Sequence, residues 1–101
     1  MSTIKHLSIG ENFSKGVRRI WLEGNALINA EFHVGRRYRR DYDERGNLLL
    51  VTDAQGKYKV SGKGEKPIID ISGGVIDRTF PRPQSSVKVA FSHGVITISE
   101  P

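Results

Sequence analysis

The chain has 101 residues, with 16 Lys and Arg against 11 Asp and Glu, and 37% of its residues are hydrophobic. This length fits one small domain with an ordinary core, and it leaves too little chain for a deep catalytic chamber around a large cofactor. The absence of cysteine excludes disulfide frameworks, thiolate metal sites and cysteine nucleophiles, while a formal net charge of +5 favours an anionic partner.

Short runs of β-branched and aromatic residues between glycines and prolines predict a mainly β chain with one or two short helices. In chain order, the expected strands are Thr3–Ile9, Arg18–Glu23, Arg36–Tyr42, Asn47–Thr52, Lys57–Ser61, Pro67–Ser72, Ser86–Phe91 and Gly94–Ser99. Between these strands, Asp43–Asn47 and Ser92–Gly94 each contain the glycine that a tight turn needs for positive φ. We therefore expect two hairpins.

Two segments depart from the strand pattern. Asn25–Phe32 begins with a residue type suited to N-capping and has an apolar pair one turn before its last two residues, which predicts a helix of two turns. A helix in Gly74–Phe80 has to end by about Phe80, because Pro81 disfavours helical geometry in the residue before it. We expect this second helix to be the shorter or more frayed of the two.

The two halves of the sequence share a pattern. Ile20-x-Leu22-x-Gly24-x-x-Leu27 matches Ile69-x-Ile71-x-Gly73-x-x-Ile76 at an offset of 49, and Gly46-x-Leu48-x-Leu50 matches Gly94-x-Ile96-x-Ile98 at an offset of 48. We expect one domain over 1–101, built of repeats at about 18–52 and 67–99 that pack around a pseudo-two-fold axis. A Gly- and Lys-rich connection, 53–66, would join them and carry one extra strand. The alternative is coincidence, because such short patterns also arise by chance.

The first repeat also resembles a known family. Ile20-x-Leu22-x-Gly24-x-x-Leu27-x-x-Ala30-x-Phe32-x-x-Gly35, followed by a basic strand and a Gly-Asn-Leu-Leu-Leu return, resembles the SymE-like domain of the AbrB (swapped-hairpin) superfamily. The resemblance covers about 18–52, with a degenerate second copy at 67–99. The family has Trp-Leu where this chain has Ala26-Leu27, and Ala-Gly-Phe where it has Ala30-Glu31-Phe32.

The resemblance implies a swapped-hairpin β barrel, here formed as a pseudo-dimer within one chain instead of by two chains. It also implies a function among DNA-binding regulators, antitoxins and SymE-type toxins proposed to act on nucleic acid. Independently of the family, strand and helix spacing points six residues of the motif into one core: Ile20, Leu22, Leu27, Phe32, Leu48 and Leu50. The motif therefore supports a fold more than an activity.

The densest functional signal is the basic strand Gly35–Tyr42. Alternation puts Arg36, Tyr38 and Arg40 on one face and Arg37, Arg39 and Asp41 on the other. If the tyrosines pack inward, one arginine pair points fully outward and the other sends only its charged heads to solvent. Guanidinium groups bind phosphates through paired hydrogen bonds, so the pattern predicts a phosphate-binding strand. The alternative is a charge-rich edge strand that blocks pairing between sheets.

Other basic residues extend the candidate site. The full set of candidate nucleic-acid-binding residues is Arg36, Arg37, Arg39, Arg40, Arg18, Arg19, Lys15, Lys57 and Lys59. The two lysines at 57 and 59 belong to a second, looser basic run. Trp21 and Tyr38 either stack on bases of a single strand or fill the core.

We expect a small basic protein that binds nucleic acid, DNA in preference to RNA and double-stranded DNA above all, as a monomeric pseudo-dimer or a homodimer. The alternatives are a SymE-like toxin that cleaves RNA, and an antitoxin or inhibitor that binds an acidic protein partner.

His6, His33 and His93 lack ligand spacing and the serines lack a nucleophile elbow, so we expect no metal or cofactor and no identifiable catalytic residue. Without an apolar stretch of ~20 residues or a signal-peptide core, we expect no membrane partner and a cytoplasmic location.

Overall fold

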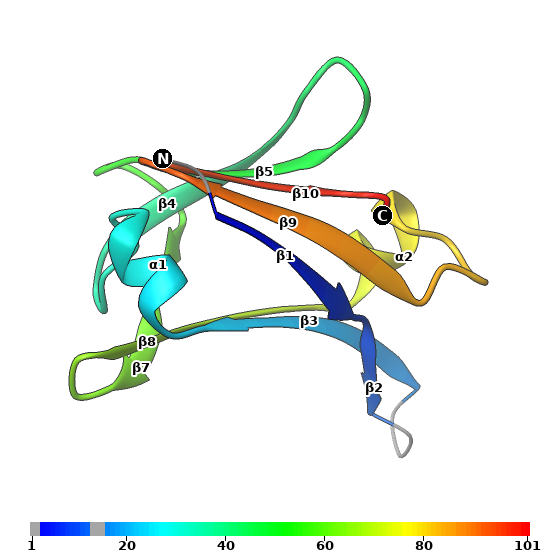
Figure 1. Ribbon diagram of the computed structural model, residues 1–101, viewed down its shortest axis with the longest axis horizontal. Helices are drawn as coiled ribbons and strands as arrows, with labels where there is room; N and C mark the ends of the chain where they lie inside the picture. Colours follow the sequence, from blue (N-terminus) through cyan, green and yellow to red (C-terminus); the bar gives the residue numbers. More distant parts are fainter. Residues whose placement is uncertain (1–2, 13–15) are drawn as a thin grey trace.

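The computed structural model describes residues 3–12 and 16–101 as two antiparallel sheets, with a short helix at each end of the space between them (Figure 1). The larger sheet has six strands in the order β1 (Thr3–Ser8), β9 (Ser86–Ser92), β10 (Val95–Ser99), β5 (Leu48–Thr52), β4 (Arg37–Tyr42) and β6 (Tyr58–Lys59). The smaller has four, in the order β2 (Gly10–Asn12), β3 (Val17–Glu23), β8 (Lys66–Ser72) and β7 (Ser61–Lys63). With helices α1 (Asn25–Asn29) and α2 (Gly74–Thr79), the chain is mainly β with two short helices, as predicted.

The two halves of the chain repeat one order of elements and pair reciprocally. The order β1-β2-β3-α1-β4-β5 is followed by β6-β7-β8-α2-β9-β10. Where β3 meets β8, Ile20 lies opposite Ile71 and Leu22 opposite Ile69. The offset of 49 relates Ile20 to Ile69 and Leu22 to Ile71. Exchanging the halves therefore turns one of these pairs into the other. Since β5 and β10 meet in the same reciprocal way, both sheets have an approximate two-fold axis between the halves.

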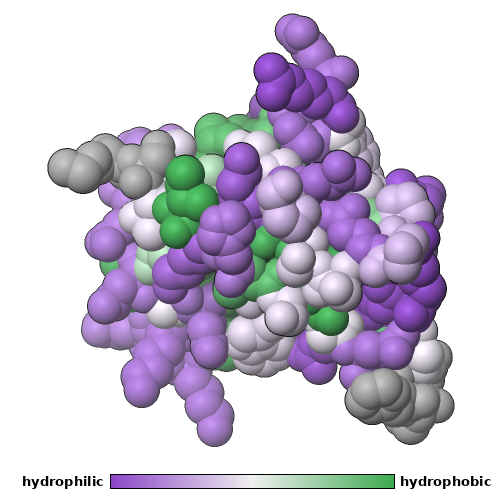
Figure 2. All heavy atoms as spheres, turned by 45° about the vertical axis from the view of Figure 1, so that its right-hand side comes forward, coloured by the Kyte–Doolittle hydropathy of each residue, from purple (hydrophilic) through white to green (hydrophobic). Residues whose placement is uncertain are grey.

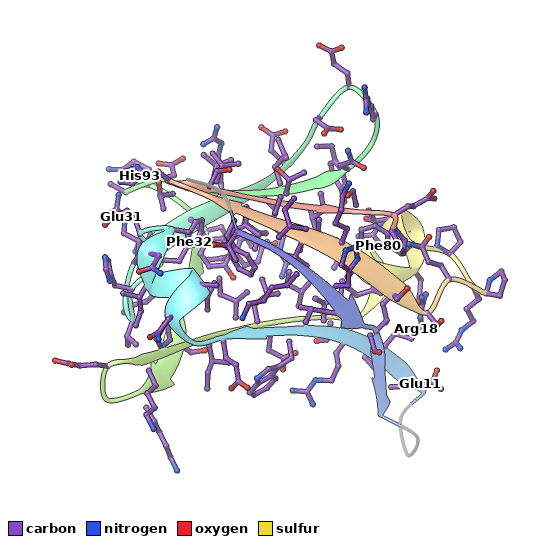
Figure 3. The ribbon with its side chains drawn as sticks, viewed as in Figure 1. Glu11, Arg18, Glu31, Phe32, Phe80 and His93 are labelled. Carbon is purple, nitrogen blue, oxygen red and sulfur yellow. The ribbon has the colours of Figure 1, made fainter. Side chains whose placement is uncertain are left out.

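The core fills the space between the two sheets. All six residues predicted to form it are at most 1% exposed: Ile20, Leu22, Leu27, Phe32, Leu48 and Leu50. Phe32 and Phe80 lie toward opposite ends of this space, each beside the helix of its own half (Figure 3). The alternation predicted from the sequence therefore identifies the core correctly.

Each helix begins after a glycine with positive φ, 88° at Gly24 and 90° at Gly73. Gly24 takes the N-cap position, so the prediction that Asn25 would cap α1 is wrong. α1 ends before the expected Phe32, because the chain takes a positive φ of 71° at Glu31.

The second helix ends where the sequence predicts. Phe80 is its C-cap, directly before Pro81. With six residues against five in α1, however, α2 is not the shorter helix. In the described part of the chain, no helix has the length and apolar content to cross a membrane.

Both expected hairpins are present, β4–β5 and β9–β10, and their turns contain Gly46 at φ 80° and Gly94 at φ 77°. The expected connection 53–66 holds two strands rather than one. β6 pairs with β4 and β7 pairs with β8, so this segment takes part in both sheets. At its start Gly56 passes so close to β4 that an added Cβ would lie 2.3 Å from the carbonyl oxygen of Tyr38. No larger residue fits there without a backbone shift.

Candidate nucleic-acid interface

Six cations gather where β4 meets β6, at one edge of the six-stranded sheet. These residues, which we call the β4–β6 cation surface, are Arg36, Arg37, Arg39, Arg40, Lys57 and Lys59. The sequence placed the two lysines in a separate and looser basic run. Strand pairing instead brings them beside the arginines.

Within this surface two like charges lie directly opposite each other. Arg37 lies directly opposite Lys59 in the register of β4 and β6. The N–H of Val60 donates to the carbonyl of Arg36, so the hydrogen-bonded pairs involve the even-numbered residues of β4. Arg37 and Lys59 thus form a non-hydrogen-bonded pair, in which opposing side chains are closest. Like charges placed directly opposite destabilise a sheet.

Neither member of this pair is neutralised from within the protein. In the described residues no ion pair involves Arg37 or Lys59. Arg37 donates one hydrogen bond, to the carbonyl of Gly56 at 3.2 Å, and both side chains belong to exposed residues. An anion from outside the chain would relieve the repulsion between them.

Arg39 is only loosely neutralised. Its guanidinium lies 4.0 Å from a carboxylate oxygen of Asp41 and 3.8 Å from one of Asp53, and neither distance is that of a hydrogen bond. The Arg39 side chain keeps 47% of its surface exposed. Arg36 is also exposed and has no ion pair within the described ranges. Both guanidinium groups are therefore accessible to a phosphate.

Arg40 turns the other way and packs on aromatic rings. Its guanidinium carbon lies 4.0 Å from the ring centroid of Tyr58, which stacks on Tyr38 with centroids 5.6 Å apart. Burial raises the pKa of Tyr38, which is 4% exposed and so belongs to the core instead of a base-stacking site. Tyr42, two residues further along this face, is 49% exposed. The inward face of β4 is thus only half covered.

Arg18 is buried, and the structure does not support its assignment to the interface. Only 3% exposed, it donates hydrogen bonds to the carbonyl oxygens of Phe80 at 2.7 Å and Gln84 at 2.6 Å and to a carboxylate oxygen of Asp77 at 3.0 Å. Its side chain lies at the α2 end of the molecule, away from the end where Glu31 and His93 lie (Figure 3). Because Arg18 ties down the segment after α2, we leave it out of the interface.

Arg19 is exposed but belongs to the other sheet. Its guanidinium lies 4.8 Å from the centroid of the Trp21 ring and donates to Asp70 at 2.9 Å. Since β3 is in the four-stranded sheet and β4 in the six-stranded sheet, Arg19 does not extend the β4–β6 cation surface. Lys15, also predicted to bind phosphate, lies outside the described residues.

Glu31, His33 and His93 form a cluster, and Figure 3 places Glu31 and His93 at the α1 end of the molecule. The carboxylate of Glu31 lies 3.0 Å from Nε2 of His33 and 3.3 Å from Nε2 of His93. The hydrogen bond with His33 is the main cause of a lowered pKa at Glu31. No ligand spacing in the sequence signals this cluster, because His93 lies 62 residues after Glu31. The side chains of Glu31, His33 and His93 are 40%, 50% and 81% exposed, so the cluster is in contact with water.

Figure 2 shows one side of the molecule, where hydrophilic residues predominate and hydrophobic ones reach the surface only in small areas. No protein-family model, curated protein or solved structure matches the chain. The geometry of the β4–β6 cation surface is therefore the basis for proposing a function.

Proposed function

We propose that the protein binds nucleic acid, with double-stranded DNA as its main ligand, through phosphate contacts from the β4–β6 cation surface. The observation that carries this proposal is the unneutralised pair formed by Arg37 and Lys59. Arg36 and Arg39 are both exposed and supply two more guanidinium groups at the same edge of the sheet. Each can donate two parallel hydrogen bonds to one phosphate.

We also propose that the two halves are copies of one swapped-hairpin unit of the AbrB type, close to the SymE-like domain. The repeated order of elements and the reciprocal registers of β3 with β8 and β5 with β10 support this. One chain would then form what that superfamily assembles from two. Phosphate contacts position a protein on DNA without reading the bases, so we expect little sequence preference.

The test measures affinity for a short labelled DNA duplex as a function of salt, by fluorescence anisotropy. If about four to six phosphates are neutralised, log affinity falls against log salt with a slope of about −4 to −5. Replacing both Arg37 and Lys59 by alanine should weaken binding to unrelated sequences equally and make the slope shallower by about 2. Lys88→Ala is the matched control, because Lys88 is the counterpart of Arg39 on β9, away from the cation surface. Affinity that does not depend on salt, or a double variant that binds like the parent, would overturn the proposal.

A further inference from the structure

The edge of β4 is covered much less than the equivalent edge of β9. β1 pairs with β9 over six residues, from Thr3 opposite Phe91 to Ser8 opposite Ser86. β6 pairs with β4 only at Arg37 and Tyr38. The rest of β4, residues 39–42, has a neighbouring strand on one side alone, which is β5.

Chain connectivity explains the difference. β6 has to return from the end of β5 at Thr52 through a short turn, and Gly56 already crosses beside Tyr38. The returning chain therefore meets β4 too late to cover anything beyond Tyr38.

The uncovered edge offers hydrogen-bonding groups. Asp43 donates its N–H to the carbonyl of Asn47 and Asp53 donates to the carbonyl of Arg37, so the odd-numbered residues of β4 bond to β5. By alternation, the backbone N–H and C=O groups of Arg40 and Tyr42 point toward the open edge. The Tyr42 N–H is held by the carboxylate of Asp41 at 2.8 Å.

The side chain of Arg40 is also incompletely bonded. Its Nε is buried without a hydrogen-bond partner. A buried donor without a partner is costly, and here it adjoins the one stretch of this strand that lacks a neighbour. The backbone groups of Arg40 and Tyr42 at this stretch indicate an edge that another strand can complete.

We propose that a second copy of this chain adds its own β4 to this edge, antiparallel, to form a two-fold dimer with a continuous sheet. The available groups fix the register, because Arg40 of one copy has to lie opposite Tyr42 of the other. Asp41 then lies on the two-fold axis, and Arg39 lies opposite Asp43 of the second copy. The guanidinium of Arg40 also meets an aromatic ring that is now 49% exposed.

Charge complementarity favours a second copy as the occupant. Within β4 and its turn the basic residues come first and the acidic residues follow, so an antiparallel copy brings opposite charges together. The two Asp41 carboxylates face each other, but Arg39 of the other chain lies diagonally beside each. A four-residue edge is small compared with the ~1,200 Å² that stable interfaces bury, so we expect a weak dimer in free solution.

The dimer would also change how the protein binds DNA, and this part rests on the proposed function. A two-fold axis perpendicular to the sheet keeps both β4–β6 cation surfaces on one face. Two linked surfaces bind one duplex more tightly than either alone, so duplex DNA should promote dimerisation.

Single-cysteine variants test the dimer directly, because the chain has no cysteine of its own. In the proposed register, the Cα atoms of position 41 are about 4.5 Å apart across a non-hydrogen-bonded pair, within the range that a disulfide spans. Asp41→Cys should therefore form a disulfide-linked dimer on mild oxidation without DNA. Glu44→Cys, in the exposed turn and away from the axis, is the matched control for random collision. Cross-linking of Asp41→Cys no faster than that of Glu44→Cys would overturn the proposal.

Sedimentation of the cysteine-free protein gives a second measurement. The parent chain should show a concentration-dependent monomer–dimer equilibrium, and Tyr42→Pro should abolish it without loss of a bond to β5, because the Tyr42 N–H points away from β5. A parent chain that stays monomeric at all concentrations, with and without duplex DNA, also contradicts the dimer. Replacing Arg37 and Lys59 by alanine should weaken DNA binding and leave the cross-link of Asp41→Cys unchanged. The two proposals can therefore fail separately.

Discussion

β4 and β9 occupy equivalent places in the two halves, but their inward faces differ. On β9, Val87, Val89 and Phe91 are all at most 4% exposed. The counterparts on β4 are Tyr38, which is buried, Arg40, which is half-buried, and Tyr42, which is 49% exposed. The strand that β1 covers along its length is apolar, and the strand that β6 only touches is charged. β4 and β9 occupy equivalent positions in the fold. They differ in how much of their length a neighbouring strand covers.

The outward face of β4 is also more highly charged than that of β9. β4 carries Arg37 and Arg39 where β9 carries Ser86 and Lys88. The outward face of β4 is thus more basic than that of β9, although both halves use the same framework of strands. This is why the proposed phosphate contacts are assigned to β4 and β6 alone.

Exchanging one residue between the two strands should give the largest effect. Val89 is fully buried, so Val89→Arg would place an unpaired charge in the core and lower the free energy of unfolding by about 3 to 5 kcal/mol. The reciprocal change Arg40→Val removes a buried donor without a partner together with a cation–π contact, and should stay within about 1 kcal/mol of the parent. Urea denaturation measures both.

Equal losses in the two variants would contradict this comparison, since they would mean that the inward face of β4 is as tightly packed as that of β9. Because Val89→Arg could prevent folding altogether, Val89→Thr provides a milder version of the same change. It should still cost more than Arg40→Val.

A smaller effect should come from the buried Arg18, whose counterpart in the second half is Pro67. Arg18→Met leaves the carbonyl oxygens of Phe80 and Gln84 without their donor and should cost about 1 to 3 kcal/mol. Asp77→Asn is the control: the Asp77 side chain is 61% exposed, so the ion pair itself should contribute less than about 1 kcal/mol. If Asp77→Asn costs as much as Arg18→Met, the ion pair and not carbonyl capping is the main role of Arg18.

The smallest effect concerns the two hairpin turns. Hydrogen bonds from the backbone and side chain of Asn47 are the main cause of a lowered pKa at Asp43, while the turn between β9 and β10 contains no acidic residue. A carboxyl group whose pKa is lowered on folding stabilises the fold above its unfolded pKa, and this contribution is lost as the pH falls through the folded value. The β4–β5 turn should therefore loosen below about pH 4.

An NMR titration can follow this change at single residues. The amide signals of Arg45 and Asn47 should move together as Asp43 is protonated, because both amides donate to its carboxylate. The buried amide of Val60, which donates to the carbonyl of Arg36, serves as the internal control. Signals of Asn47 that do not move in acid would show that the carboxylate does not hold this turn in solution.

The sequence predicted local features of the fold well. Alternating apolar residues identified most strands, and glycine positions identified both turns, because these signals depend on neighbours in the chain. The internal pattern predicts two repeats at about 18–52 and 67–99, and this stays a prediction. It did not reveal that 53–66 contributes strands to both sheets, since β6 and β7 are short and exposed and their pairing depends on β4 and β8.

Predictions about the site were less reliable, because they depend on residues far apart in the chain. Arg18 looked like a surface cation, but its partners are 59 to 66 residues away. Arg19 is near β4 in the sequence and lies in a different sheet. Conversely, Lys59 lies opposite Arg37, a pairing that the charge pattern alone could not indicate.

The reciprocal pairing within a single polypeptide has an evolutionary consequence. In an assembly of two identical subunits, every substitution occurs twice, so a residue that suits one copy of a strand has to be tolerated in the other. Here a mutation in β4 leaves β9 as it was. One half can then accumulate changes that improve ligand recognition at some expense to its own packing, while the other keeps the apolar side chains that hold the molecule together.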